Sequence, residues 1–407
     1  MRVLMLATYF PKPGNPLMGT WALEQAQALA QHPDIDLKVV SFTSWVPQWV
    51  SRFSAGARAY AECPATHNWQ GLEVLYPRWC WYPMRPMKDW EYKRPLPFLR
   101  IAWHSAAPFL TKVIAAFKPD IVFAHHSAIN GYIAAKIKHH FGIPFVVTDH
   151  DFGEIQNCDT LPARRSLFEH ITREASCMVS VSRRMELILL RLFPHATTRV
   201  VHNGTLEALL PAHANSNTPT TRIIFSCGAF YERKGFPLLI EAFARISRKY
   251  PFAVLRIAGD GDQRLLAEAT ARNKGVHEKV LFLGFLPHDR VLSEMASAHV
   301  FALVGWDEPF GVVFAEALAA GKPIICATDC GITDVVRSGV HGLTVPPGDV
   351  AAAADALDTL LGDEAGRMRM GIAARQLFEN ELTWRKNASH MYSIFNSALL
   401  TARVADV

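Results

Sequence analysis

The chain has 407 residues, of which 50% are hydrophobic, 19% charged and 11% aromatic. This length favours two or three domains with sizeable cores over a single small module, and the composition excludes global disorder and a fibrous repeat. The net charge is +5, and residues 1–200 hold 22 of the 42 Lys and Arg residues but only 15 of the 37 Asp and Glu residues. A surplus of this size favours phosphate-bearing ligands or an anionic membrane surface, and it is too small for a nucleic-acid-binding stripe, so no nucleic-acid partner is expected.

Short apolar or β-branched runs alternate with helical periodicity along the chain, which is typical of βαβ units and a parallel sheet. The predicted strands of the first half are 2–8, 37–42, 120–126, 144–150, 177–182 and 199–203, and the helices between them include 21–32, 106–117 and 129–141. The predicted strands of the second half are 222–230, 253–260, 279–285, 300–306 and 322–328. The predicted fold is therefore α/β, with two open parallel sheets that bind ligands at the carboxyl ends of their strands.

One stretch between the two halves lacks periodicity. Residues 208–221 are rich in Ala, Asn, Pro and Thr and are interpreted as an interdomain linker. They separate a predicted N-terminal α/β domain, residues 1–207, from a predicted C-terminal α/β domain, residues 222–383. The last helical stretch, 384–407, is open to two placements, one on the C-terminal domain and one back on the N-terminal domain.

The ends and the cysteines bear on the compartment. The start, MRVLMLATYF, is too short for a signal peptide or a membrane span, and no later run reaches about 18 uninterrupted apolar residues. The seven cysteines lack the spacing of a zinc ribbon or a disulfide framework. The predicted location is the cytoplasm, with peripheral attachment to the inner face of the membrane as an option.

The segment from Trp45 to Trp103 breaks the α/β rhythm. It holds seven of the ten tryptophans together with several Lys and Arg residues, and its prolines prevent one regular amphipathic helix. One interpretation is an acceptor-side surface whose Trp rings sit at a bilayer interface while basic side chains meet anionic headgroups. The other is a long loop whose aromatic side chains pack on their own domain.

The most informative segment is EPFGVVFAEALAAGKPI, in which Glu308 and Glu316 flank the predicted start of a helix near Phe310 or Gly311. Backbone N–H groups at such a start are unpaired and favour an anion or a hydroxyl-rich ligand with an acidic partner. Gly311 lets that backbone approach closely. Two carboxylates at the start of one helix can accept hydrogen bonds from two diols.

A second segment, SCGAFYERKGFPLLIEAF, runs from a strand through Arg233 and Lys234 to a helix. It offers a cationic pair and a helix N-terminus to a diphosphate, and it can stabilise charge that develops on a departing phosphate. Neither this segment nor the previous one is a Walker loop or a complete GxGxxG fingerprint. A P-loop NTPase and a nicotinamide enzyme are therefore both disfavoured.

Several histidines raise the question of a metal site. His125, His126 and His150 lie near Asp149 and Asp151, and a His139-His140 pair ends a predicted helix. Adjacent residues on a strand point to opposite faces, so only one of His125 and His126 can face a given site, and cationic side chains are favourable at a helix C-terminus. No metal is therefore expected.

Taken together, these segments resemble retaining glycosyltransferases of family four, which have the GT-B fold of two Rossmann-like domains facing each other across a cleft. The match runs through nearly every element of about residues 222–362, and in the N-terminal half it covers the framework only. The segments that carry it are FPKPGNPLMGTW, PDIVFAHH, VVTDH, VVHNG, GAFYERKG, LRIAGDGDQR, VLFLGF, EPFGVVFAEALAAGKPI and GITDVVRSGVHGLTVPPGD.

The resemblance implies that the N-terminal domain, residues 1–207, binds the acceptor and that the C-terminal domain, residues 222–383, binds the nucleotide sugar. It also implies a role for each matching residue. Glu316 is expected to hold the ribose diol of a UDP- or GDP-sugar, Glu308 to contact hydroxyls of the donor sugar, and Lys234 to bind the diphosphate. Phe310 and Gly311 would offer backbone contacts. Gly19 sits where the first βα loop approaches the diphosphate, although Met18-Gly19 replaces the usual Gly-Gly, and His125 matches a His that faces the donor sugar.

Two departures from the family pattern concern phosphate binding. Ala229 stands where relatives often have Arg, so Arg233 would have to supply that contact, and Cys330-Gly331-Ile332-Thr333-Asp334 replaces Gly-Gly-Ile-Pro-Glu. The implied reaction is sugar transfer with retention to a carbohydrate, lipid-linked or small-molecule hydroxyl, without cofactor or metal. A nucleotide-sugar epimerase on the same plan and a non-catalytic sugar-nucleotide-binding protein are the alternatives.

Overall fold

A computed structural model describes residues 1–82, 87–205 and 221–405. The chain divides into two compact units, of which unit 1 comprises Met1–His202 and Asn387–Val407 and unit 2 comprises Asn203–Lys386. The predicted linker, residues 208–221, lies outside the described residues except for Thr221, and so do residues 83–86 of the Trp-rich segment.

Unit 1 is built on an eight-stranded sheet with the strand order β10-β9-β8-β7-β1-β2-β5-β4. Neighbouring strands run parallel, except that β4 is antiparallel to β5. The strands are β1 (Arg2–Ala7), β2 (Asp36–Val40), β4 (Thr66–Trp69), β5 (Leu72–Leu75), β7 (Ile121–His125), β8 (Phe145–Asp149), β9 (Cys177–Ser180) and β10 (Thr198–Val200). The strand order changes direction between β1 and β7, and the loops that follow these two strands start at this point.

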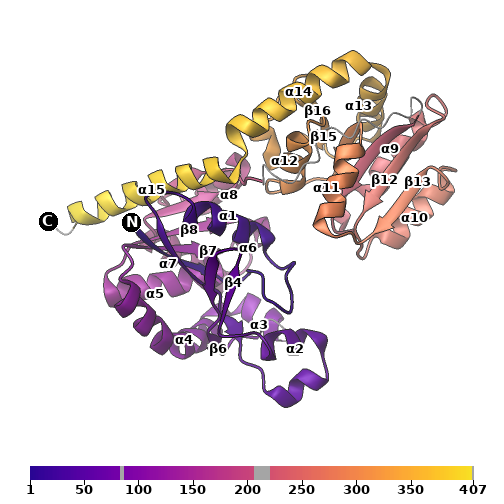
Figure 1. Ribbon diagram of the computed structural model, residues 1–407. Helices are drawn as coiled ribbons and strands as arrows, with labels where there is room; N and C mark the ends of the chain where they lie inside the picture. Colours follow the sequence, from indigo (N-terminus) through magenta and orange to yellow (C-terminus); the bar gives the residue numbers. More distant parts are fainter. Residues whose placement is uncertain (83–86, 206–220, 406–407) are drawn as a thin grey trace. The chain divides into compact units, whose positions relative to one another are not determined.

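Helices and short connections surround this sheet (Figure 1). The central strands are continuous apolar runs, and both of their faces are buried, as is typical of parallel sheets. The helices are α1 (Thr20–Ala30), α2 (Ala55–Ala61), α3 (Met87–Lys93), α4 (Pro95–Phe117), α5 (Tyr132–Phe141), α6 (Phe152–Gln156), α7 (Pro162–Glu174) and α8 (Arg183–Leu192). A separate pair of two-residue strands, β3 (Thr43–Ser44) and β6 (Arg78–Trp79), pairs in parallel.

The C-terminal helix α15 (Trp384–Ala405) runs along unit 1 (Figure 1). Its residues Ala388, Met391 and Phe395 recur at helical spacing and are buried in the same core as β1 and β7. The Phe395 ring meets the Phe123 ring of β7 edge-on, with the centroids 5.3 Å apart. The end of the chain therefore completes the core of the unit that contains its beginning.

Unit 2 holds a six-stranded, fully parallel sheet in the order β13-β12-β11-β14-β15-β16. This is the Rossmann order, and it changes direction between β11 and β14. The strands are β11 (Arg222–Cys227), β12 (Ala253–Ala258), β13 (Val280–Gly284), β14 (Val300–Leu303), β15 (Ile324–Ala327) and β16 (Gly342–Val345). The helices are α9 (Phe236–Ile246), α10 (Arg264–Asn273), α11 (His288–Ser297), α12 (Val312–Ala319), α13 (Val350–Gly362) and α14 (Glu364–Glu381). The predicted α/β class with two Rossmann-like domains is confirmed.

The packing of α15 gives a first prediction. Phe395→Ala should lower the free energy of unfolding by about 3–5 kcal/mol, because it opens a cavity in a closed core. Leu400→Ala on the same helix, where the side chain is exposed, should change it by no more than about 0.5 kcal/mol. Urea unfolding followed by circular dichroism measures both, and equal effects of the two substitutions would contradict the docking of α15.

Candidate active site

Two loops meet at the carboxyl edge of the sheet of unit 2, where β11 and β14 lie side by side. The loop after β11 contains the 3-10 turn Glu232–Lys234, and the loop after β14 begins at Val304. The Trp306 N–H donates to the Arg233 carbonyl over 2.8 Å. A Cβ atom on Gly305 would lie 2.1 Å from that carbonyl oxygen, so the two backbones can approach this closely only because residue 305 is glycine.

This approach brings one carboxylate onto two cations. Oε2 of Glu308 accepts from Nη1 of Arg233 over 2.8 Å and from Nζ of Lys234 over 2.6 Å. Lys234 and Glu308 are largely shielded from solvent, which strengthens charge-assisted hydrogen bonds relative to exposed pairs. The Glu308 backbone is held as well, because its carbonyl accepts from the Gly331 N–H over 2.9 Å. The departure from the family pattern at residues 330–334 therefore lies against Glu308.

The helix that follows begins where the sequence predicts. Gly311 precedes the first residue of α12 with a φ of +81°, in the left-handed region. A Cβ atom there would lie 2.6 Å from a ring carbon of Phe314 and 3.0 Å from Cγ of Glu308. Phe310 is buried beside it. Gly311 therefore leaves room for the Glu308 side chain at the start of α12.

The second acid of the motif, Glu316, is also buried, and it lies on α12. Its Oε1 accepts from Nε2 of His288, the first residue of α11, over 2.9 Å. Cys227, which ends β11, lies near both Glu316 and Lys234. Burial raises the pKa of its thiol, repulsion from Glu316 adds to that shift, and Lys234 opposes it.

Sequence reasoning missed His288. It lies outside the motif, 28 positions before Glu316, and its imidazole fixes the orientation of that carboxylate. A histidine at the first turn of a helix carries no signal of its own, so only the packing of α11 against α12 identifies it.

Two of the predicted site residues belong to unit 1. Gly19 precedes α1 with a φ of +69°, and a Cβ atom there would lie 2.4 Å from the Tyr9 carbonyl oxygen. His125 ends β7 and is fully buried, and neither of its ring nitrogens has a hydrogen-bond partner among the residues that the structure describes. Burial, followed by the neighbouring His150 and His126, holds the pKa of His125 well below its ordinary value. The structure thus brings Arg233, Lys234, Glu308, Gly311 and Glu316 into one region of unit 2, and Gly19 and His125 lie at the equivalent sheet edge of unit 1.

The histidines that could bind a metal lie in two separate groups. The rings of His125 and His150 have centroids 5.0 Å apart, whereas His139 and His140 pair at the end of α5. Among the residues that the structure describes, no three His, Cys, Asp or Glu side chains are grouped to hold a metal ion.

Some tryptophans of the Trp-rich segment are buried and others are exposed. Trp79, Trp81 and Trp103 are buried in unit 1, and Trp79 stacks on Phe42 with the centroids 4.3 Å apart. The side chains of Trp45, Trp49 and Phe53 are 52%, 66% and 79% exposed. These three residues, with the exposed Arg52 and Arg58, are called the aromatic surface below. None of the described helices combines the length and the apolar character needed to cross a bilayer.

Known protein families match both units of this chain. A family model for Glycosyltransferase Family 4 matches residues 84–205, and one for Glycosyl transferases group 1 matches residues 212–377. Glycogen synthase of Mycobacterium tuberculosis is 28% identical over 290 residues, which is 70% of each chain.

Solved structures share the fold. Sucrose-phosphate synthase of Thermosynechococcus elongatus has a TM-score of 0.77 at 20% identity over 98% of this chain and 100% of its own. Anabaena HepE, solved in complex with UDP-glucose, has a TM-score of 0.68 at 17% identity over 98% of this chain and 100% of its own. The chain is therefore an enzyme, a glycosyltransferase of the GT-B fold. Within that class it belongs to the family-four type, with one matching domain in each unit.

The environment of Gly311 gives a second prediction. Gly311→Ala should lower the free energy of unfolding by about 2–5 kcal/mol, the sum of a left-handed φ and of overpacking against Phe314. Gly339→Ala is the matched control, since Gly339 has a φ of +80° and open space around it. It should cost only about 1–2 kcal/mol. Chemical denaturation measures both, and equal losses would show that Phe314 and Glu308 do not constrain residue 311.

Proposed function

We propose that the protein transfers a hexose-type sugar from a UDP- or GDP-sugar to a hydroxyl of a glycan, a lipid-linked or a small-molecule acceptor, with retained anomeric configuration. This reaction would serve the synthesis of a cell-surface polysaccharide or glycoconjugate. The observation that carries the proposal is the Glu308 carboxylate bound to Lys234 and Arg233 at the edge of a Rossmann sheet. The UDP-glucose bound to HepE supports a nucleotide-sugar donor.

Each group in unit 2 receives one part of the donor. Lys234 and Arg233 bind the diphosphate, and Arg233 takes over the contact that relatives make with the Arg that is replaced here by Ala229. Glu316, oriented by His288, accepts hydrogen bonds from the ribose diol. Glu308 accepts from hydroxyls of the donor sugar, with Phe310 and Gly311 supplying backbone contacts. Taken by itself, unit 1 has Gly19, which would admit a diphosphate, and His125, which would face a sugar.

The chemistry needs no covalent intermediate and no metal. The bond between the anomeric carbon and the diphosphate oxygen breaks while the acceptor oxygen bonds to that carbon on the same face. The acceptor proton passes to the departing diphosphate oxygen. Lys234 and Arg233 stabilise the negative charge that develops on the diphosphate, which is the contribution that preorganised cations make best.

The shared cations lead to a third prediction. A diphosphate must compete with Glu308 for Lys234 and Arg233, so Glu308→Gln should tighten binding of UDP or GDP by about three- to tenfold while transfer falls. Glu316→Ala should instead weaken nucleotide binding by about tenfold or more, because a charged acceptor of the ribose diol is lost. Isothermal titration calorimetry measures both affinities.

The control variant is Glu294→Gln, which breaks an ion pair with Arg256 elsewhere in unit 2 and should leave nucleotide affinity unchanged. If Glu316→Ala binds the nucleotide as tightly as the wild type, Glu316 does not bind the ribose. If Glu308→Gln binds the nucleotide more weakly than the wild type, Glu308 does not compete with the diphosphate. Turnover assays decide between transfer and epimerisation, since an epimerase converts the donor without any acceptor.

Peripheral attachment to the membrane is part of the proposal. The segment 45–61, which contains the aromatic surface, includes Arg52 and Arg58 and no Asp or Glu. Exposed Trp and Phe rings favour the headgroup region of a bilayer, and the two arginines favour anionic lipids. The aromatic surface therefore supports the proposal that the acceptor-binding unit attaches to the inner face of the membrane, where lipid-linked acceptors lie.

The fourth prediction tests this contact. The protein should float with vesicles containing phosphatidylglycerol at low salt, and the double variant W49A/F53A should float at least about fivefold less. High salt should weaken flotation, because the arginine contribution is screened. The control F252A/L265A removes two equally exposed apolar side chains from unit 2 and should float like the wild type. Failure of the wild type to float at either salt concentration would discard membrane attachment.

A further inference from the structure

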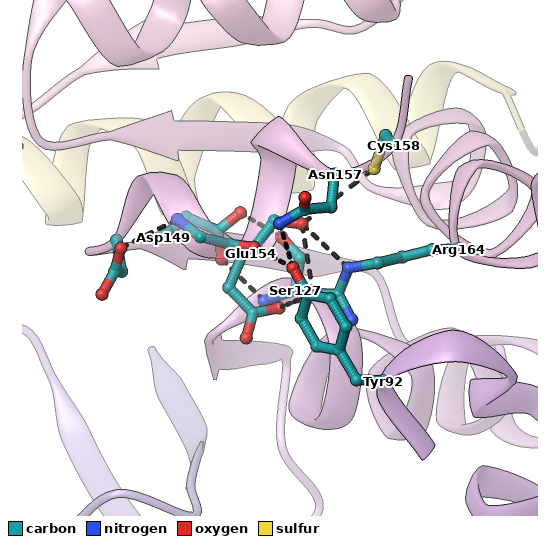
Figure 2. A network of polar contacts seen from close by, with 9 residues as sticks. Tyr92, Ser127, Asp149, Glu154, Asn157, Cys158 and Arg164 are labelled. Carbon is teal, nitrogen blue, oxygen red and sulfur yellow. Dashed lines mark hydrogen bonds and ion pairs between the residues drawn. The ribbon is translucent and has the colours of Figure 1, made fainter. Parts of the chain in front are cut away.

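A buried polar cluster lies in unit 1 just beyond β7 and β8, and the proposed function gives it no task (Figure 2). Its centre is Asp149, the last residue of β8, whose exposure is only 2%. Oδ1 of Asp149 accepts from the Ser127 N–H over 2.7 Å, and Oδ2 accepts from the Ser127 hydroxyl. Two bonds thus join the end of β8 to the turn that follows β7.

That turn is strained. His126 has a φ of +70°, which is rare for any residue other than glycine, and it stands directly between His125 and Ser127. Such a conformation persists only where the surroundings over-determine it. The His126 N–H donates to the Thr148 carbonyl over 2.8 Å, and the Asn130 amide donates to the His125 carbonyl. Asp149 supplies the two hydrogen bonds to Ser127, the residue that follows His126.

Asp149 also fixes the other side of His125. The next residue, His150, packs its ring against that of His125, at 5.0 Å between centroids, and against that of His126, at 5.6 Å. The Asp149 carboxylate therefore holds the turn that follows His125, and the Asp149 backbone leads directly to His150, whose ring packs on that of His125.

Two charged residues that act electrostatically on Asp149, Arg164 and Glu154, are joined to each other. Arg164, only 2% exposed, donates from Nε and Nη2 to the Glu154 carbonyl, pairs with the Glu154 carboxylate, and lies over the Tyr92 ring (Figure 2). Burial raises the pKa of Asp149 to about 7, and the Glu154 charge adds to this shift, whereas the bonds from Ser127 and the Arg164 charge oppose it.

We propose that Asp149 is a positioning residue for His125. Through the N–H and hydroxyl of Ser127 it holds the strained turn that leaves β7, and through His150 it holds the ring packed on His125. This proposal rests on the proposed function only in that His125 is assigned to face the sugar. The placement of His125 stands on the contacts of unit 1.

Either protonation state of Asp149 makes both bonds to Ser127. The ionised carboxylate accepts twice, whereas the protonated form accepts the N–H at Oδ1 and donates from Oδ2 to the hydroxyl. Asparagine has the same shape and the same arrangement of one acceptor and one donor as the protonated form. Asp149→Asn should therefore preserve the position of His125, and Asp149→Ala should lose it.

The experiment measures the position of His125 without any ligand. The full chain at pH 6 is treated with diethyl pyrocarbonate, and modification of His125 is followed by peptide mass spectrometry. In the wild type the buried His125 should react slowly. Asp149→Ala should raise its rate at least tenfold, and Asp149→Asn should stay within twofold of the wild type. His104, on the exposed side of α4, is the internal control and should react equally in all three proteins.

Two results would overturn the proposal: slow modification of His125 in Asp149→Ala, and a rate for Asp149→Asn as high as that for Asp149→Ala. If Asp149→Ala does not fold, Ser127→Ala removes the hydroxyl bond alone and should raise the rate of His125 by about threefold, and an unchanged rate there would be equally decisive. UDP titration of each folded variant keeps the two proposals apart. Absence of nucleotide binding in the wild type would contradict the proposed function and leave the His125 result intact.

Discussion

The candidate active site depends on one close approach of two backbone segments at the carboxyl edge of the sheet of unit 2. Gly305 lies against Arg233 and Lys234 at a distance that no side chain would allow, and the neighbouring Gly235 adopts a positive φ as the chain turns into α9. Only with the loops this close can the carboxylate of Glu308 bind both cations. The charge pattern of the site is thus a consequence of backbone packing.

In unit 1, different contacts hold the equivalent position together. Where β1 and β7 lie side by side, Asn130 links the ends of the two strands, because it accepts from the Thr8 hydroxyl over 2.8 Å and donates to the His125 carbonyl. Side-chain hydrogen bonds here take the place of the paired glycines of unit 2. The edge of unit 1 is thus held by the neutral side chains of Thr8 and Asn130, whereas the edge of unit 2 carries the charged side chains of Glu308, Arg233 and Lys234.

Electrostatics and burial also divide the proposed roles. Lys234 and Arg233, which would stabilise a leaving diphosphate, are already paired with Glu308. When a diphosphate binds, these cations exchange the carboxylate for phosphate oxygens, so their charges stay compensated. The aromatic surface is a separate feature, made of apolar rings that unit 1 leaves in solvent.

Local patterns in the sequence were sufficient for the α/β class, the central strands and the main site candidates. Strands such as β1, β7 and β11 are continuous apolar runs, and Glu308, Glu316 and Lys234 stand in segments whose spacing and family resemblance point to a sugar nucleotide. The strands β4, β5 and β16, at or near the sheet edges, escaped prediction. β4 has no buried residue and β5 and β16 have two each, so none of them is a continuous apolar run. Tertiary structure alone decided that Glu308 binds Arg233 and Lys234, that His288 orients Glu316, that Asp149 holds Ser127, and that Trp79 is buried while Trp49 is exposed. The physical reason is that periodicity reports which face of an element is apolar, whereas a hydrogen bond between residues tens of positions apart depends on how those elements pack.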